Sequence, residues 1–376
     1  MNTTGDQQLV KRINRSVLLR LLRAQPGLSR ARLSQHSGLT KSTVSALVRE
    51  LLAEHWLSEA SAPVAQDGMG RPSTPLHINA DVRVLIGVEI GVRQMRLVQV
   101  SLTGEVLASA GQPLASTQAR PVCAQAAQMV RQAWLALTRN HLQLSGVGVC
   151  LPGAIDEGSG VVQFAPNLGW RDVKFLAMLT RALAQAGLPE MGIHLHNDAD
   201  AAALGEYEFA GGESEDPLIF VNCDVGLGAG IVLNDRLFTG ARGMAGEIGH
   251  SIMQVDGVLC SCGRRGCAET FIGARALDTA EGVERAARYL GVLIQNLDVM
   301  FNPRVVVVGG QSCSTHADLL EGAARSVQAY ARSAGVPAPV VRGARYGLLA
   351  AAVGAAAVAL HRYLRPMHIQ SLPGKA

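Results

Sequence analysis

Residues 217–243 read PLIFVNCDVGLGAGIVLNDRLFTGARG, and they repeat the plan of an earlier stretch, VRVLIGVEIGVRQMRLVQVSLTGEVLASA at residues 82–110. In each stretch an apolar strand is followed by a glycine-containing segment, a second strand, a tight polar turn and a third strand. Helical segments follow both units. The repetition predicts a duplicated α/β fold with a cleft between its two halves.

A third glycine signal supports this duplication. The run VVVVGGQS at residues 305–312 places two glycines directly after a strongly β-branched segment, so we expect it at a strand end that faces the cleft. A single glycine-rich turn is a weak signal, whereas three in matched settings are much stronger.

Length and composition narrow the class of protein. The chain has 376 residues, which suits two or three domains, and 48% of them are hydrophobic. The N-terminus shows no signal-peptide pattern. The alanine-rich run at 347–360 is shorter than the roughly twenty residues of a membrane span, which favours a buried helix. Seven cysteines without a signal peptide argue against a disulfide framework. These features predict a cytoplasmic protein with no membrane contact.

The positive charge is concentrated at the N-terminus. Residues 1–78 hold ten Lys and Arg against five Asp and Glu, whereas the remainder holds twenty-four against twenty-five. This distribution predicts a small module with an anionic partner, joined to a near-neutral body.

The basic module has the pattern of a winged helix-turn-helix. A helix is expected over 13–22, a second from Ser29 to Gly38, and a third over 40–57, with Thr40 as its cap. A tight glycine turn before a helix that begins with small polar and basic residues fits a DNA major groove. Hydroxyl side chains allow close approach to bases, and Lys or Arg reaches phosphates. The residues that we expect to contact DNA are Lys41, Ser42, Thr43, Ser45 and Arg49.

A plain three-helix bundle with a solvated basic face is the alternative, and the complete pattern favours DNA over it. Residues 61–80 are rich in Gly, Pro, Ser and Ala and are expected to form a wing or linker. Within it Arg71 follows GMG and precedes proline, so it is either a minor-groove contact or part of a simple linker.

The most specific motif lies between residues 246 and 269. It reads GEIGH and then C-x-C-G-x-x-G-C-x-E, and it holds three of the seven cysteines. This motif, in a body from about residue 82 to 361, resembles the ROK family of repressors, open reading frames and sugar kinases. With the winged helix in front, the chain resembles the family's transcriptional repressors.

The resemblance implies an actin-like, ribonuclease-H-like duplicated fold with a sugar in the cleft, and a homodimer or homotetramer. The expected domains are 1–60 for the winged helix and 81–376 for a sugar-binding body of two α/β lobes. The resemblance also implies a structural Zn²⁺, for which one imidazole and three thiolates form a closed tetrahedral site. The implied zinc ligands are His250, Cys260, Cys262 and Cys267. The metal would position the loop between His250 and Glu269 rather than perform chemistry.

The same resemblance assigns a set of sugar ligands. Carboxylates and amides offer the donors and acceptors that a polyol needs when it loses water. The implied sugar-binding residues are Asn167, Asn197, Asp198, Glu247, His250 and Glu269.

Kinase activity is not expected. Asp198 matches the family's catalytic base, but phosphoryl transfer depends on cradling the phosphates. Val92 places a branched side chain where backbone should meet phosphate in the first phosphate loop, which spans residues 89–94. Arg93 and Leu227 each replace a hydroxyl residue of the family's loops. Two roles stay open for Arg93: its guanidinium binds the phosphate of a phosphorylated sugar, or it forms a surface salt bridge.

The sequence therefore predicts a sugar-responsive transcriptional regulator, a repressor that binds operator DNA and is released by a sugar or sugar derivative. Two alternatives stay open. One is an ATP-dependent sugar kinase with an attached DNA-binding domain, and the other is a constitutive DNA-binding protein with a vestigial sugar site.

Overall fold

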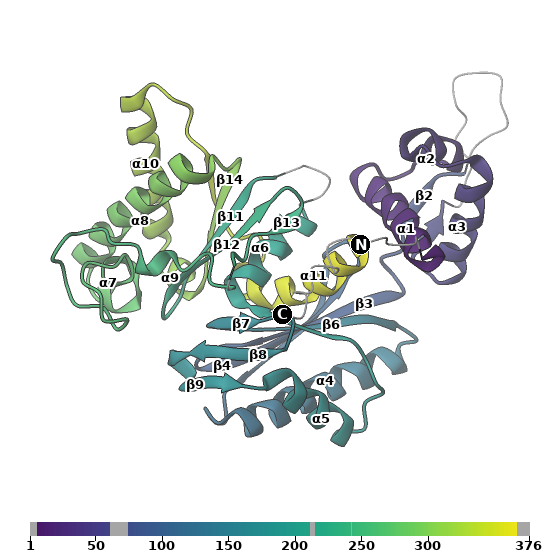
Figure 1. Cartoon of the computed structure of the whole chain (residues 1–376), viewed down its shortest axis with the longest axis horizontal. Coiled ribbons are helices and arrows are strands. Elements are labelled where there is room, and N and C mark those ends of the chain that lie inside the picture. Colours follow the sequence, from purple (N-terminus) through teal and green to yellow (C-terminus); the bar gives the residue numbers. More distant parts are fainter. Residues whose placement is uncertain (1–5, 61–73, 211–214, 242, 367–376) are drawn as a thin grey trace.

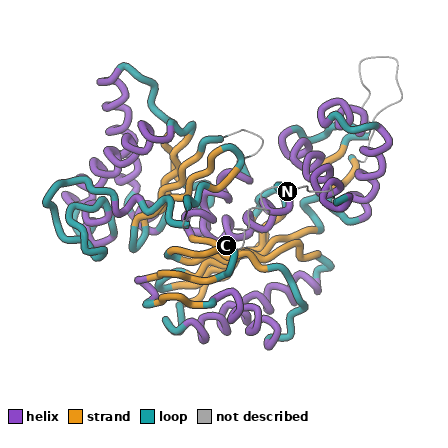
Figure 2. Tube along the Cα trace, viewed as in Figure 1, coloured by secondary structure: helices purple, strands orange, loops and turns teal. Residues whose placement is uncertain are grey.

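The computed structural model describes residues 6–60, 74–210, 215–241 and 243–366. In Figures 1 and 2 one lobe lies at the bottom, the other at the upper left, and a small helical domain lies at the upper right, beside the C-terminal helix. Arg71, predicted as a minor-groove contact, lies outside the described residues.

The small domain is a winged helix-turn-helix, as predicted. Its helices are α1 Gln7–Ala24, α2 Arg30–Ser37 and α3 Lys41–Ala53, and the strands β1 Leu57–Glu59 and β2 Leu76–Ile78 pair antiparallel. The side chains of Ser29 and Thr40 cap α2 and α3 as expected, and Gly38 ends α2 at a φ of 71°.

The predicted end of the third helix is wrong. The helix stops at Ala53, because His55 adopts a left-handed φ of 59° and the N–H of Trp56 returns to the carbonyl of Leu51 at 2.8 Å. This is a Schellman ending, which glycine usually makes. Leu57 therefore begins a strand, and Leu76, from the segment read as wing or linker, is fully buried with the helices.

The first lobe contains a five-stranded sheet in the order β10-β6-β3-β4-β5. The helices α4 and α5 cover its outer face through a continuous apolar core. The elements are β3 Arg83–Ile90, β4 Gln94–Ser101, β5 Val106–Pro113, α4 Ala119–Arg139, β6 Gln143–Leu151, α5 Phe175–Gln185 and β10 Ile193–Asn197. A separate three-stranded sheet consists of β7 Ala154–Asp156, β8 Val161–Ala165 and β9 Trp170–Val173.

The second lobe repeats this topology, which confirms the duplication. Its sheet runs β13-β12-β11-β14-β15, with three antiparallel strands followed by two parallel ones, as in the first lobe. The elements are β11 Leu218–Cys223, β12 Leu227–Leu233, β13 Arg236–Leu237, α8 Ala280–Phe301, β14 Val305–Gly309, α10 Ala317–Ala334 and β15 Val340–Gly343.

Two central helices are exchanged between the lobes. The helix α6, Asp198–Glu208, follows the first sheet but packs on β11 and β12, whereas α11, Ala350–Leu364, follows the second sheet and packs on β3 and β6. The two helices cross in direct backbone contact. A Cβ on Gly354 would lie 2.0 Å from the carbonyl oxygen of Ala201, and a Cβ on Gly205 would lie 2.9 Å from the Cα of Gly354.

The crossing also explains the alanine-rich run near the C-terminus. Within the described residues, Gly347–Leu364 is one helical stretch long and apolar enough to cross a membrane, yet 67% of it is buried inside the fold. Its small side chains allow α11 to lie close to both α6 and the first sheet, so the prediction of a buried helix is confirmed.

Gly354→Val should destabilise the protein by about 1–3 kcal/mol or more, because the added side chain meets backbone atoms that cannot rotate away. Chemical denaturation monitored by circular dichroism measures the change. Gly111→Ala is the matched control, since a Cβ there meets nothing within 4 Å. Equal unfolding midpoints for both variants and the wild type would contradict the close crossing.

Candidate functional site

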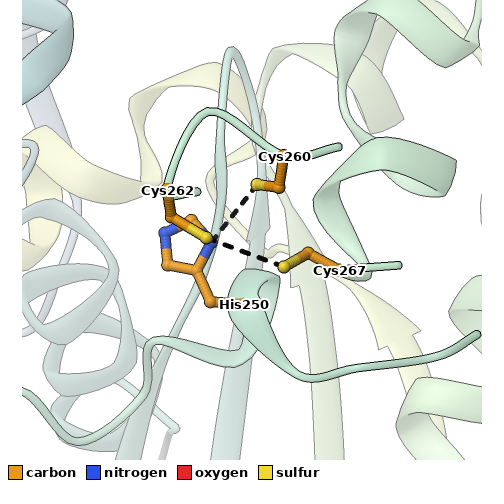
Figure 3. Close-up of side chains that lie close together, drawn as sticks. All are labelled: His250, Cys260, Cys262 and Cys267. Atoms are coloured by element: carbon orange, nitrogen blue, oxygen red, sulfur yellow. Dashed lines mark hydrogen bonds between the residues drawn. The ribbon is translucent and has the colours of Figure 1, made fainter. Parts of the chain in front are cut away.

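Four potential metal ligands converge beside the second lobe (Figure 3). One ligand atom from each of His250, Cys260, Cys262 and Cys267 lies within 4.8 Å of the others. The Sγ atoms of Cys262 and Cys267 are 3.7 Å apart, and Cys260 Sγ lies 3.8 Å from His250 Nδ1. His250 ends a short 3-10 helix, Ile248–His250.

Tight turns bring these ligands together. The N–H of Cys260 bonds to the carbonyl of Arg264 at 2.8 Å, and bridges join Ile252 to Cys267 and Leu259 to Arg265. Gly266 is required here, because it has a φ of 72° and a Cβ would lie 1.7 Å from the carbonyl oxygen of Gln254. Gly266 therefore shapes the loop, and the thiols of Cys260, Cys262 and Cys267 lie close to one another and to His250.

The donor set fits a tetrahedral metal ion. With Zn–S bonds of about 2.3 Å, two sulfurs on one tetrahedral ion lie about 3.8 Å apart, close to the spacing seen here. Burial raises the pKa of Cys267 to about 12, and a coordinated cation deprotonates such a thiol outright. The cluster can hold a metal ion with no position left for water.

Glu269 links this loop to the lobe junction. It begins α7, Glu269–Ile272, two residues after the last cysteine. Its Oε2 accepts a hydrogen bond from the N–H of Leu227 at 3.2 Å. A Cβ on Gly226 would lie 3.1 Å from this oxygen and 4.0 Å from Asn167 Nδ2. Asn167 of the first lobe and Glu269 of the second therefore approach the same glycine.

The Asn197-Asp198 pair starts α6 at the same junction. Asn197 caps the helix: its Oδ1 accepts from the N–H groups of Ala199 and Asp200, and its Nδ2 donates to the carbonyl of Gly153. The side chain of Asp198 accepts from Asn222 Nδ2 at 3.3 Å. Burial raises the pKa of Asp198 to about 6.

Electrostatic interactions connect the predicted sugar residues. The carboxylate of Asp198 is repelled by those of Asp224 and Glu247, and Glu247 interacts with both His250 and Glu269. Five predicted residues thus gather at the junction of the lobes, namely Asn167, Asp198, Glu247, His250 and Glu269. The sixth, Asn197, lies beside them, but its amide is engaged as a helix cap.

Sequence reasoning missed two members of this cluster, Asn222 and Asp224. Asn222 lies one residue before the end of β11 at Cys223, and Asp224 follows that end, directly before the glycine-rich segment. Their position as polar residues at a strand end of the second repeat was the sequence signal that could have assigned them to the site. Their position opposite Asp198 depends on the packing of the two lobes.

Of the residues predicted to impair kinase activity, Val92 is half-buried, Arg93 is exposed and Leu227 is buried. Gly91, Val92 and Arg93 form the tight turn between β3 and β4, where the N–H of Gly91 bonds to the carbonyl of Gln94 at 2.9 Å. Leu227 is buried in the core of the second lobe and belongs to β12, so most of the G-x-G-x-G segment lies in a strand and not in a loop.

A buried ion pair lies next to that turn. Arg96 Nη1 contacts both carboxylate oxygens of Glu89 at 3.1 and 3.2 Å, and Glu89 is only 8% exposed. Burial raises the pKa of Glu89 to about 7 even though Arg96 opposes the shift. The adjoining cavity, lined by residues of both lobes including Asn222, Asp224 and Gly310, has a volume of about 20 Å³.

The predicted DNA-binding residues lie on α3. Lys41, Ser42 and Arg49 are exposed, and Thr43 and Ser45 are half-buried. The hydroxyl of Thr40 lies 2.9 Å from that of Ser42 and 2.8 Å from that of Thr43, which orders the start of the helix. The opposite face, formed by Val44, Leu47, Val48 and Leu51, is buried as predicted.

Solved structures with related folds cover most of the chain. A ROK family transcriptional regulator, a homologue of the E. coli MLC protein, superposes with a TM-score of 0.75 over 96% of this chain and 98% of its own, at 22% identity. A ROK family glucokinase from Streptomyces griseus, solved with glucose and AMPPNP, gives 0.60 over 73% of this chain and 98% of its own, at 27% identity.

Sequence comparisons agree with these structures. A putative xylose repressor from Caldicellulosiruptor is 30% identical over 348 residues, which is 82% of this chain and 85% of the relative. A winged helix-turn-helix DNA-binding profile matches residues 12–57. The ROK family profile matches residues 85–282 and 277–362. The chain therefore belongs to the ROK family and carries an N-terminal winged helix-turn-helix.

Proposed function

We propose that this protein is a transcriptional repressor that binds operator DNA through α3 and is released when a sugar binds at the junction of the two lobes. One observation carries the proposal: a winged helix and a ROK body with a polar cluster are joined in a single chain. The similarity to a relative named as a xylose repressor supports it.

The charge of the junction favours a neutral sugar. Asp198, Asp224, Glu247 and Glu269 gather there, and burial raises the pKa of Asp198 because its charge is poorly solvated. A phosphate group would add repulsion to this acidic cluster. Hydroxyl groups can instead donate to these carboxylates. We therefore infer a neutral monosaccharide, with D-xylose as the first candidate because of the named relative.

Phosphorylation of the sugar is not part of the proposed function. Arg96 occupies the region beside Glu89 where the family resemblance places the first phosphate loop, and Leu227 points into the core. We infer that both features disfavour the binding of nucleotide phosphates. Asp198 then acts as a sugar ligand alone.

The metal in this account is a structural Zn²⁺ held by His250, Cys260, Cys262 and Cys267. Three thiols and one imidazole at these distances suit zinc. The ion positions its loop, and through that loop it positions Glu247 and Glu269 for the sugar.

DNA recognition assigns different tasks to the residues of α3. Lys41 and Arg49 contact phosphates, whereas Ser42, Thr43 and Ser45 face bases or order the helix start. A two-fold operator requires two copies with recognition helices about 34–36 Å apart, or a multiple of that spacing. The homodimer or homotetramer and the role of Arg71 remain predictions.

Purified protein should contain one Zn²⁺ per chain, and Cys262→Ser should lose the metal and weaken sugar binding at least tenfold. Elemental analysis and calorimetry with D-xylose measure the two effects. Cys313→Ser is the control, because Cys313 lies outside the cluster. Full sugar affinity in the zinc-free variant would refute the positioning role of the metal.

D-Xylose, D-glucose and N-acetylglucosamine should each fail to turn over with Mg-ATP. One lost hydrogen bond to a charged group costs about 1.5–3 kcal/mol, so Asp198→Asn should weaken binding of the effector sugar roughly 10- to 100-fold. A coupled ATPase assay and calorimetry provide the measurements. Turnover that disappears in Asp198→Asn would establish a kinase instead.

Lys41→Ala should weaken binding to all DNA sequences, and its plot of log affinity against log salt should be shallower by about one unit. Ser42→Ala and Thr43→Ala should instead change which sequences are preferred. Fluorescence anisotropy with operator and random duplexes measures both effects. Arg325→Ala, on the exposed face of α10, is the matched control. If Lys41→Ala matches that control, recognition lies elsewhere, on the wing or Arg71.

A further inference from the structure

Two elements run from the candidate sugar site to the winged helix. The helix α6 begins at Asp198, ends at Glu208 and contains eleven residues, a length of about 16 Å. The strand β12 begins at Leu227, whose N–H bonds to Glu269, and spans seven residues, roughly 20 Å. The turn that follows β12 contains Asp235.

Both far ends contact α1 of the winged helix. Arg23 donates to the carbonyl oxygens of Leu102, at 2.7 Å, and of Glu208. Arg20 Nη1 lies 3.5 Å from the carboxylate of Asp235. The helix α1 therefore contacts the end of α6 through Arg23, and the turn after β12 through Arg20.

Arg365, near the C-terminal end of α11, joins the same two ends. It contacts the carboxylate of Glu208, which also bonds to His361 Nδ1 at 2.6 Å, and it contacts Asp235 at 3.1 Å. Arg365 is only 8% exposed, so displacing Asp235 would leave this buried cation with Glu208 as its one carboxylate partner among the described residues. Tyr207 donates a further hydrogen bond to Asp235.

The turn holds Asp235 firmly to the second lobe. Its backbone N–H and that of Asn234 donate to the side chain of Asp216, at 2.7 and 3.0 Å. Any rotation of the second lobe therefore carries the carboxylate of Asp235 with it.

The winged helix packs mainly on α11. Trp56 stacks on Tyr363 of α11 at a ring distance of 4.1 Å, and Leu18 and Leu22 share an apolar core with Leu364. Since α11 packs on the first sheet, the winged helix follows the first lobe. A cavity of about 520 Å³, lined by residues of α1, α6 and α11, leaves space for movement on the Asp235 side.

We propose that Asp235, shared between Arg20 of the winged helix and Arg365 of α11, transmits movement of the second lobe to the DNA-binding domain. The inference rests on the proposed function, because it requires the sugar site to move the lobes. In this proposal the contact of Asp235 with Arg20 belongs to the operator-binding arrangement of α1. Sugar binding shifts β12 and weakens that contact.

The test compares how strongly sugar changes operator affinity in the wild type and in Asp235→Asn. The wild type should lose about 5- to 150-fold in operator affinity on saturation with D-xylose, or with the sugar that calorimetry identifies. Asp235→Asn removes the charge at nearly constant shape, and it should reduce that change to less than twofold. Its sugar affinity without DNA should equal or exceed that of the wild type, because Asp235 lies at the far end of β12 from the sugar ligands and the contact that sugar has to weaken is already absent.

Two further variants separate the explanations. Glu321→Gln removes an exposed carboxylate elsewhere in the second lobe and should keep full sugar sensitivity. Arg20→Gln should lose sensitivity like Asp235→Asn, and the double variant should lose no more than either single one, because both act through one contact. Arg20→Gln also serves as the test if Asp235→Asn fails to fold.

The outcomes distinguish this inference from the proposed function. A wild type whose operator affinity does not respond to sugar overturns the proposed function, and the inference with it. A responsive wild type together with fully responsive Asp235→Asn and Arg20→Gln overturns the inference alone. Sensitivity lost in these two variants and kept in Glu321→Gln supports it.

Discussion

The crossing of α6 and α11 is the constraint on which the rest of the structure depends. Each helix leaves its own lobe and packs on the other sheet, and the backbones meet where only glycine fits, at Gly205 and Gly354. The crossing sets Asp198, at the start of α6, against the second lobe. It also brings the other ends of both helices together at Glu208 and Arg365, where Arg23 of the winged helix contacts Glu208.

This geometry explains how a small ligand could act on distant DNA. The candidate sugar site takes Asn167 from one lobe and Glu269 from the other, so a bound polyol would favour one relative position of the lobes. A ligand shifts such an equilibrium only by its differential affinity for the two positions. A metal held by His250 and the three cysteines would also contribute to sugar binding, because it would fix the loop that is flanked by Glu247 and Glu269.

Local patterns predicted the repeated hairpins and the caps at Ser29 and Thr40, because each depends on residues close in sequence. The family resemblance implied the four metal ligands, whose side chains the structure brings together. The left-handed ending at His55 was missed, since glycine usually takes that conformation. The ion pair of Arg96 with Glu89 fills a region that sequence could only mark as altered. Contacts such as Arg20 with Asp235 join residues more than 200 positions apart, and only the packed lobes bring them together.

The central claim is that the sugar site and the DNA site are energetically coupled, and linkage makes this coupling reciprocal. The most direct measurement is a calorimetric titration of the wild-type protein with its sugar, with and without saturating operator DNA. The account predicts that operator weakens sugar binding by the same factor by which sugar weakens operator binding. Identical sugar affinities in the two titrations would contradict it, and tighter sugar binding in the presence of operator would identify a co-repressor instead.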